Sequence, residues 1–296
     1  MDGVLLIDKP AGPTSHDVVA RLRGTSRERS IGHTGTLDPR ATGLLPLVCG
    51  RATRLASLLS GEDKVYEATI RFGWATDTDD ADGEPLGPPS NLTPTDTGVA
   101  DAASAFRGTF DQMPPTHSAK RLGGHKAYDL ARSDAPVALR AVPVTVKALE
   151  ITGRQGNELH LRVTASAGFY VRALARDLGE KLGCGAHLLG LRRTRSGAFD
   201  VADALPLAQA ERLGRDVAAH VILPAAALPH LPAVQVTPIG LKRAVHGNAL
   251  GPEHLEGRFV PPHSMGGPVR VLGPDGQLVA LAHSRGGSLH PAVVLG

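Results

Sequence analysis

A glycine-rich segment near the start of the chain carries one imidazole and one carboxylate. It reads Gly32-His33-Thr34-Gly35-Thr36-Leu37-Asp38-Pro39-Arg40-Ala41-Thr42-Gly43. Its glycines permit tight turns and close approach to a ligand, and a carboxylate in such a loop can act as a nucleophile or a general base. The Gly-Lys-Ser/Thr of a phosphate-binding loop is absent. Taken alone, Asp38 before a proline is as typical of a turn cap as of a catalytic residue.

Tyr66 lies on the apolar side of a predicted strand. Residues 65–72 alternate, so that Tyr66, Ala68, Ile70 and Phe72 fall on one face and polar residues fall on the other. The pattern predicts a half-buried strand. Taken alone, a tyrosine at this position is more typical of a core than of a site.

Arg172 follows a second predicted strand and begins a predicted helix. Residues 159–165 alternate in the same way, and an apolar stripe then runs from Val171 to Leu182 until Gly183 ends it. A side chain at such a strand-to-helix junction can be aimed into a cleft. Without other information, an arginine at a helix start is usually solvated.

Local signals predict the elements that must hold these residues. Residues 4–7 read as a short buried strand, and Thr14 with Asp17 resembles the capping box of a helix that follows. Residues 30–50 are predicted as a loop running into an apolar stretch. The polar, proline-rich residues 77–97 are predicted as a surface loop.

The pattern of apolar residues changes near Pro232. Short apolar pieces separated by glycine and proline follow, and residues 269–281 give a strand–turn–strand signal. We therefore expect two domains, a large one over residues 1–231 and a small β-rich one over residues 232–296.

Basic residues are clustered, although the net charge is only +3. Residues 162–195 contain seven lysines and arginines against two acidic residues, and the tail adds Lys242, Arg243 and Arg270. Such clusters favour a phosphate-rich partner, although solvated arginines give the same pattern.

The sequence carries no signal for a metal, a disulfide framework or a membrane span. Two cysteines and thirteen histidines show no ligand spacing. A calcium loop starting at Asp77 would need oxygen ligands where Ala81 and Pro88 stand. With no long apolar segment and no leader-like start, we expect a cytoplasmic protein that binds no metal and no membrane.

Ordered motifs along the chain resemble those of the TruB family of tRNA pseudouridine synthases. They are Asp8-Lys9-Pro10-Ala11-Gly12-Pro13-Thr14-Ser15, the glycine-rich segment, Lys64-Val65-Tyr66, Thr76–Gly83, Gln112-Met113-Pro114-Pro115, Ala127-Tyr128, Tyr170-Val171-Arg172 and Leu191-Arg192-Arg193-Thr194. The resemblance covers residues 1 to about 200, and parts of the tail look like a PUA-type RNA-binding domain. It implies an α+β fold, with a pseudouridine synthase catalytic domain built on a largely antiparallel central sheet and a small β-rich PUA-like domain.

The resemblance also implies a reaction and its catalytic residues. Members of the family isomerise uridine 55 in the T-loop arm of tRNA to pseudouridine, so we expect an isomerase that binds the tRNA T-stem and loop, as a monomer. Asp38 would be the catalytic nucleophile or base. Tyr66 would stack on the target base and help move a proton, and Arg172 would pair with Asp38. Because the uracil never leaves the site, no cofactor is expected.

Four further residues are implied to bind the substrate. Leu191 would line the base pocket, and Tyr170 belongs to the motif that carries Arg172. His33 would help open the T-loop and hold the flipped base, and Lys9 would support the loop around the catalytic carboxylate.

Two other functions fit parts of the sequence. A non-catalytic RNA-binding or RNA-folding protein would keep the basic clusters but could lose Asp38, Tyr66 or Arg172, and all three are present. A glycoside hydrolase would need a second acid placed as a proton donor, and no motif supplies one.

The chain departs from the family pattern in four places. His117 stands where tyrosine is common, Lys120-Arg121 replaces an apolar–lysine pair, and Ala167 and Phe169 replace a usual lysine and threonine. We expect these differences to alter contacts with RNA and to leave the catalytic residues intact.

Overall fold

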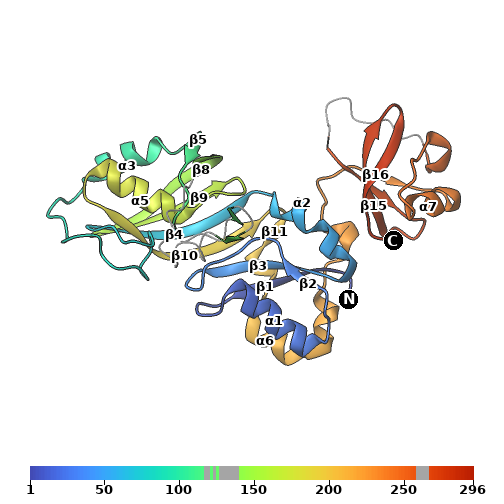
Figure 1. Cartoon of the computed structure of the whole chain (residues 1–296), viewed down its shortest axis with the longest axis horizontal. Coiled ribbons are helices and arrows are strands. Elements are labelled where there is room, and N and C mark those ends of the chain that lie inside the picture. Colours follow the sequence, from blue (N-terminus) through green and yellow to red (C-terminus); the bar gives the residue numbers. More distant parts are fainter. Residues whose placement is uncertain (117–120, 123–124, 127–139, 258–266) are drawn as a thin grey trace.

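The computed structural model describes residues 1–116, 121–122, 125–126, 140–257 and 267–296. In this part of the chain ten strands form one large sheet, most of whose neighbouring strands are antiparallel (Figure 1). Its order is β12 (Leu205–Pro206), β1 (Gly3–Lys9), β3 (Thr42–Cys49), β10 (Ala186–Ser196), β4 (Lys64–Phe72), β9 (Glu158–Ala165), β8 (Val142–Gln155) and β5 (Gly108–Gln112), with β2 (Ile31–His33) beside β3 and β11 (Phe199–Asp200) beside β10. The predicted α+β fold is confirmed.

Strand β1 is buried on both faces, which explains the unbroken apolar run at its centre. Leu5 and Ile7 point into one core, whereas Val4 and Leu6 point into another on the opposite side of the sheet. A strand covered on both faces needs apolar side chains at every position. By contrast, β4 alternates as predicted, and Ala68, Ile70 and Phe72 of its apolar face lie in a single core.

Helices cover the large sheet in two groups (Figure 1). The first group, α3 (Asp96–Ser104) and α5 (Val171–Leu182), packs with β4, β8 and β9 around one core. The second, α1 (Ser15–Ser26), α6 (Leu207–Leu213) and the 3₁₀ helix η3 (Gly214–His220), packs with β1 and β3 around another. Tyr66 and Leu191 contact both cores. They therefore lie at the seam between the two groups of helices.

The ends of α1 and α5 follow the predicted signals. The Thr14 side chain accepts a hydrogen bond from the backbone N–H of Asp17, and the Asp17 carboxylate accepts one from the N–H of Thr14, which completes the capping box. Helix α5 ends at Gly183, whose φ of 69° suits a residue without a side chain. Both predicted helices are confirmed.

Residues 30–50 are not the simple loop that the sequence predicts. They contain β2 and β3, and β3 pairs with β1 along the whole of that strand. Strand β3 is buried on both faces and includes Gly43 and Pro46, so it shows neither alternation nor the usual strand composition. The prediction was wrong here because the pattern of a doubly covered strand has no period of two.

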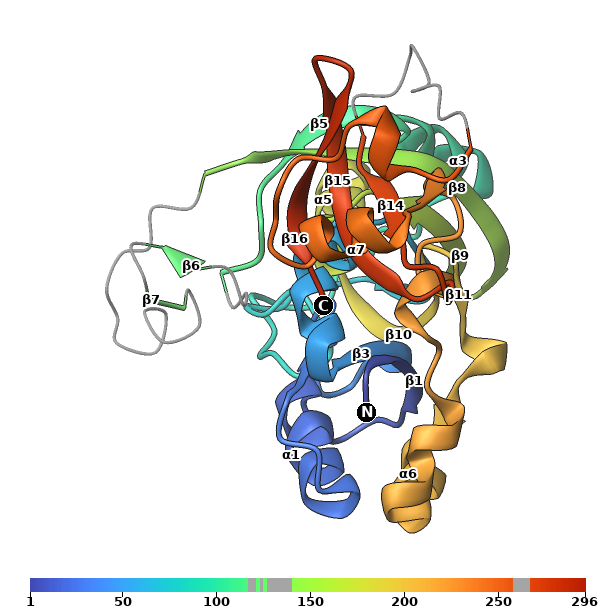
Figure 2. The same cartoon turned by 90° about the vertical axis from the view of Figure 1, so that its right-hand side faces the viewer.

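A second sheet of four strands follows near the C-terminus (Figure 2). It consists of β13 (Ala233–Gln235), β14 (Val269–Leu272), β15 (Leu278–Arg285) and β16 (Ser288–Val294), beside α7 (Pro238–Ala244) and η5 (Pro252–His254). Strands β14 and β15 are the predicted strand–turn–strand. The sheet has a core of its own, but Leu278, Leu281 and Leu295 also pack with Val4 and Leu6 of the large sheet.

Short elements complete the described chain. They are η1 (Gly50–Leu55), α2 (Ala56–Ser60), η2 (Val201–Asp203), η4 (Pro224–Ala226) and the paired β6 (Arg121–Leu122) and β7 (His125–Lys126). The motif Ala127-Tyr128 and the departures at His117 and Lys120 lie outside the described residues. No helix in the described ranges is long and apolar enough to cross a membrane.

Two of the three basic tail residues are engaged inside the protein. The Arg270 guanidinium donates to the carbonyls of Leu231 at 3.0 Å and Ala225 at 2.7 Å, and Arg243 donates to the carbonyl of Ala249 at 2.9 Å. Lys242 is exposed. Of these three residues, we therefore expect Lys242 to be the one available to a phosphate.

Candidate active site

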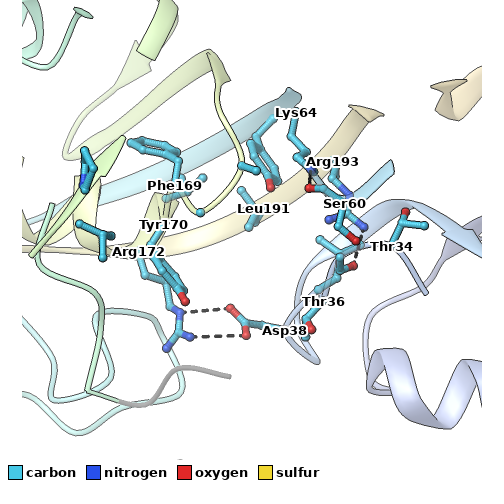
Figure 3. A pocket seen from close by; sticks show the side chains of 18 residues that line it. Thr34, Thr36, Asp38, Ser60, Lys64, Phe169, Tyr170, Arg172, Leu191 and Arg193 are labelled. Carbon is cyan, nitrogen blue, oxygen red and sulfur yellow. Dashed lines mark hydrogen bonds and ion pairs between the residues drawn. The ribbon is translucent and has the colours of Figure 1, made fainter. Parts of the chain in front are cut away.

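A cavity of about 520 Å³ opens at the seam between the two helix groups (Figure 3). Its lining comes from the loop after β2, from β4 and β10, and from the turn that precedes α5. The predicted site residues Asp38, Tyr66, Tyr170, Arg172 and Leu191 all line it. The fold thus brings together five residues that the sequence spreads over more than half of the chain.

Asp38 and Arg172 form a two-pronged ion pair on one side of this cavity (Figure 3). Arg172 Nε lies 3.1 Å from Asp38 Oδ2, and Nη2 donates to Oδ1 at 3.4 Å. The arginine side chain is only 7% exposed, whereas that of Asp38 is 43% exposed. The fork of the buried guanidinium therefore sets the direction of a carboxylate that remains open to the cavity.

The surroundings of Asp38 act on its pKa in opposite directions. Burial raises the pKa of the carboxyl group above its ordinary value, and the neighbouring charge of Asp80 adds to this. The Arg172 guanidinium is the largest opposing influence, and Lys9 also lowers the pKa. Arg172 therefore both aims the carboxylate and favours its ionised form.

The acidic loop between β4 and α3 contacts Arg172. Arg172 Nη1 donates to the carbonyl of Thr78 at 3.0 Å and lies 3.6 Å from Asp80 Oδ2. The loop is fixed to β10 by backbone hydrogen bonds from Leu188 to Asp79 and from Ala81 to Leu188, each 3.0 Å long. Among the described residues no group of three or more potential ligands could hold a metal ion.

Lys9 anchors the loop that carries Asp38 without lining the cavity. Its fully buried Nζ donates to the carbonyls of Pro10 and Pro13, each at 2.9 Å, and of Pro39 at 3.1 Å. Burial lowers the pKa of this ammonium group to about 8, while Asp38 opposes the change. These contacts are what a supporting residue for the loop requires.

The turn before α5 forms another wall of the cavity. The side chain of Gln112, itself 1% exposed, donates to the Tyr170 carbonyl at 3.0 Å and accepts from the Tyr170 N–H at 2.9 Å. Ala167 and Phe169, two of the departures from the family pattern, also line the cavity. Gln112 thus fixes the backbone that leads into Arg172.

His33 lies outside this cavity. It lines a separate groove between α1 and β2, where its ring stands 5.3 Å from that of His16. Burial lowers the pKa of His33 to about 4, with His16 and Arg193 adding to the effect, so its imidazole is neutral at pH 7. The structure does not bring His33 to the carboxylate of Asp38.

The sequence analysis missed Arg193, which is 1% exposed and lines the cavity. Its type places it with the basic cluster of residues 162–195, but it lies on β10 in the middle of the large sheet. The sequence does contain a signal that Arg193 faces the pocket. In a strand, residues 191 and 193 share a face, so assigning Leu191 to the pocket also places Arg193 there.

Comparisons with known proteins identify the family of the chain. Residues 23–171 match the sequence model described as TruB family pseudouridylate synthase (N terminal domain), and residues 172–227 match the tRNA pseudouridylate synthase B C-terminal domain. The chain is 42% identical to tRNA pseudouridine synthase B of Thermobifida fusca, over 99% of this chain and 98% of that protein. It is 43% identical to the protein of the same name from Gloeobacter violaceus, over 100% and 99%.

Among solved structures, a chain of the archaeal box H/ACA sRNP Nop10-Cbf5 complex has the same fold. The TM-score is 0.74 at 24% identity, and the match covers 99% of this chain and 86% of that one. The family that the motifs predict is confirmed, and with it the isomerase class. This chain belongs to the TruB family of pseudouridylate synthases.

Proposed function

We propose that this protein converts uridine 55 in the T-loop arm of tRNA to pseudouridine, with Asp38 as the catalytic carboxylate. The observation that carries the proposal is the ion pair of Asp38 with the buried Arg172, at 3.1 Å in a cavity of about 520 Å³. The family to which the chain belongs supplies the substrate class.

The reaction rearranges one nucleotide without net gain or loss of atoms. The N1–C1′ bond breaks with its electron pair on the uracil, the uracil turns, and a C5–C1′ bond forms. The proton on C5 is then lost and N1 gains one. Asp38 acts as the nucleophile or base that starts this sequence, in a cavity where Arg172 aims it and favours its ionised form. No cofactor or metal is required.

The remaining lining residues hold the extruded base. Taking a uridine out of folded tRNA costs a few kcal/mol, and stacking on an aromatic ring returns about 1–3 kcal/mol. Tyr66 supplies that ring and helps move a proton, and Leu191 and Tyr170 complete the pocket. Lys9 supports the loop around the site, and His33 contacts the opened T-loop from its own groove.

At the level of the whole chain, two domains divide the work. Residues 1–231 form the catalytic domain, and residues 232–296 form a PUA-like RNA-binding domain that contacts tRNA away from the uridine. The protein works as a monomer. It acts in the cytoplasm, where its tRNA substrate is found.

Pseudouridine mapping tests this function. A T-arm transcript with uridine labelled by tritium at C5 is incubated with the purified protein, and released tritium and the modified position are measured. We expect release from position 55 alone, none from a transcript with cytidine 55, and none with Asp38→Asn. Tight binding of the transcript without modification by the wild-type protein would favour the alternative, a non-catalytic RNA-binding or RNA-folding protein.

A further inference from the structure

Two buried cations, Lys64 and Arg193, line the same wall of the cavity. Arg193 of β10 is 1% exposed, and Lys64, the first residue of β4, is 5% exposed. They lie close to each other, because a Cβ placed on Gly35 would stand 3.4 Å from Arg193 Nη1 and 3.9 Å from Lys64 Cε. Figure 3 shows both on the side of the cavity away from Asp38 and Arg172. Two like charges are therefore buried side by side.

The hydrogen-bond partners of both cations are backbone carbonyls. Arg193 donates from Nε to the carbonyl of Leu44 at 2.7 Å and from Nη2 to the carbonyl of Gly35 at 3.1 Å. Lys64 Nζ donates to two carbonyls of the turn that precedes β4. These bonds fix the positions of the two charges but leave them without a negative partner.

The two acidic residues just before Lys64 are held by other groups. Glu62 Oε1 lies 3.3 Å from His230 Nε2, and Asp63 Oδ2 lies 2.5 Å from Lys147 Nζ. Among the described residues no ion pair joins either buried cation to an acid. Burial lowers the pKa of Lys64 to about 8, and the neighbouring guanidinium adds to the effect, so the ammonium group remains charged at pH 7. Because buried charges are normally paired, this wall fits a site whose negative charge comes from a ligand.

The neighbours of the two cations indicate which part of a nucleotide reaches them. Arg193 is the register partner of Tyr66 in the pairing of β10 with β4, and Lys64 lies two residues before Tyr66. Leu191 lies two residues before Arg193 and lines the same cavity. A base stacked on Tyr66 is therefore beside both cations, whereas neither cation is among the groups that act on the pKa of Asp38. The base, rather than the ribose or its phosphates, meets this wall.

We propose that Lys64 and Arg193 form a cationic wall that binds the uracil as an anion, the state in which the broken N1–C1′ bond leaves it. The inference rests on the proposed function and adds a stabilising group to the same site. When the bond breaks, its electron pair stays on the uracil, and negative charge spreads over N1 and the two carbonyl oxygens. Fixed positive charges beside the base stabilise this charge as it develops. Neither cation gives up a proton in the step.

The ionisation of a bound uracil analogue measures this preference without turnover. 5-Nitrouracil ionises near neutral pH and changes its absorption spectrum when it does, so its pKa can be titrated in the complex. We expect the wild-type protein to bind the anion about tenfold more tightly than the neutral form, and so to lower that pKa. Lys64→Met keeps the length of the side chain and removes its charge, so most of this preference should be lost. An unchanged or raised pKa in the wild type, or no saturable binding, would overturn the proposal.

Two controls separate the cationic wall from general effects of charge. Arg71→Met removes a cation from the same strand outside the cavity, where Arg71 pairs with Glu158, and should leave the preference for the anion unchanged. Inorganic phosphate at the same concentration as 5-nitrouracil should not displace it. Displacement would assign the two cations to a phosphate instead of the base and would refute the proposal.

Single-turnover kinetics connect the cationic wall to the reaction. Lys64→Met should lower the rate at saturating T-arm RNA about tenfold, by the same factor as the preference for the anion, with RNA affinity unchanged. A variant that loses the rate but keeps the lowered pKa of 5-nitrouracil would show that Lys64 acts only on the structure. The wild-type titration needs no variant, so it decides the proposal even if Lys64→Met does not fold. Failure of the wild-type protein to modify the T-arm would refute the proposed function and leave that titration readable.

Discussion

At the scale of single residues, the site contains one carboxylate, Asp38, whose pKa is shifted in opposite directions by burial and by a neighbouring guanidinium. Burial raises the pKa of Asp38, and Arg172 lowers it. A raised pKa means that the folded protein prefers the protonated form more than the unfolded chain does. The ionised carboxylate therefore lowers the free energy of unfolding once the pH passes the unfolded value. In the proposed function, Asp38 therefore serves the reaction at some cost to the stability of the fold.

Asp38→Asn should abolish isomerisation and leave the protein at least as stable as the wild type at pH 7. The amide cannot act as a nucleophile or base, and it removes the burial of a charge. Tritium release and thermal unfolding measure the two effects. Turnover by the variant would contradict the catalytic assignment, and a midpoint lowered by several degrees would contradict the account of its stability.

The pH dependence of the rate should follow the ionisation of Asp38. Because the ionised form of Asp38 is the one proposed to react, the single-turnover rate should rise with pH through a pKa above that of an ordinary aspartate. Arg172→Gln removes the charge that most strongly lowers the pKa of Asp38. The rise of the rate on the acid side of the pH profile (its acid limb) should therefore move to still higher pH.

Arg176→Gln is the matched control for that shift. Arg176 begins the next turn of α5 and pairs with Asp79 at 3.0 Å, and it is not among the groups that act on the pKa of Asp38. Its acid limb should stay near that of the wild type. An acid limb that moves equally in both variants would show that Arg172 has no special role.

Tyr66 should make two separable contributions. Tyr66→Phe keeps the ring, so RNA affinity should be retained, but the hydroxyl is lost and product formation should nearly cease. Tyr66→Leu should also weaken binding, by about 1–3 kcal/mol, because the stacking surface is lost. Filter binding measures RNA affinity, and tritium release measures product formation. Near-normal turnover by the Phe variant would show that the hydroxyl takes no part in the reaction.

The sequence predicts the residues with proposed catalytic and pocket roles better than the residues that position them. Asp38, Tyr66, Arg172 and Leu191 could be named because they stand in ordered motifs, and the cavity contains all four. Arg193 could not be recognised by its type, since an arginine on its own suggests the surface. Its burial depends on carbonyls from Leu44 and Gly35, which come together only when β3 and β10 pair.

At the scale of elements, β4 could be predicted from the sequence, whereas β3 could not. β4 is covered on one face, so its alternation is visible in the sequence, whereas β3 is covered on both and reads as a loop followed by an apolar stretch. The pattern of β10 is obscured in the sequence for a different reason. Its register with β4 shifts after Leu188 and again after Arg193, and such irregularities break a period of two next to a site.

Gly43 shows how closely β3 must approach β10, and it provides a test of that packing. Its φ is 97°, and an added Cβ would lie 2.3 Å from the Arg193 carbonyl oxygen. Gly43→Ala should lower the free energy of unfolding by about 1–3 kcal/mol from backbone strain, before the clash is counted. Denaturant unfolding measures the change.

Gly24→Ala is the control substitution. Gly24 lies within α1, its Cβ would meet nothing within 4 Å, and it has no positive φ. Because alanine is the better helix former, this change should stabilise the protein by about 0.5–1 kcal/mol. Equal destabilisation by the two substitutions would mean that the approach of β3 to β10 imposes no constraint.

At the scale of the whole molecule, the small sheet is joined to the large one by a shared apolar core. Leu278, Leu281 and Leu295 pack with Val4 and Leu6. Removing the residues from 232 onward would expose that surface, so a truncation would mix loss of RNA contacts with loss of stability. Substitution of a single exposed basic residue beside the small sheet tests the contribution of that sheet to RNA binding more directly.

Lys242 on α7 is that residue. It is exposed, whereas Arg243 and Arg270 donate to main-chain carbonyls. If the small sheet holds tRNA phosphates, Lys242→Gln should weaken binding and reduce the slope of log affinity against log salt by about one. Turnover at saturating RNA should not change, because the site lies in the other sheet. Lys147→Gln, which removes a charge from β8 where Lys147 pairs with Asp63, should alter neither slope nor turnover. An unchanged slope for Lys242→Gln would exclude it from the RNA contact, and a lower rate at saturation would place the small sheet in the catalytic step.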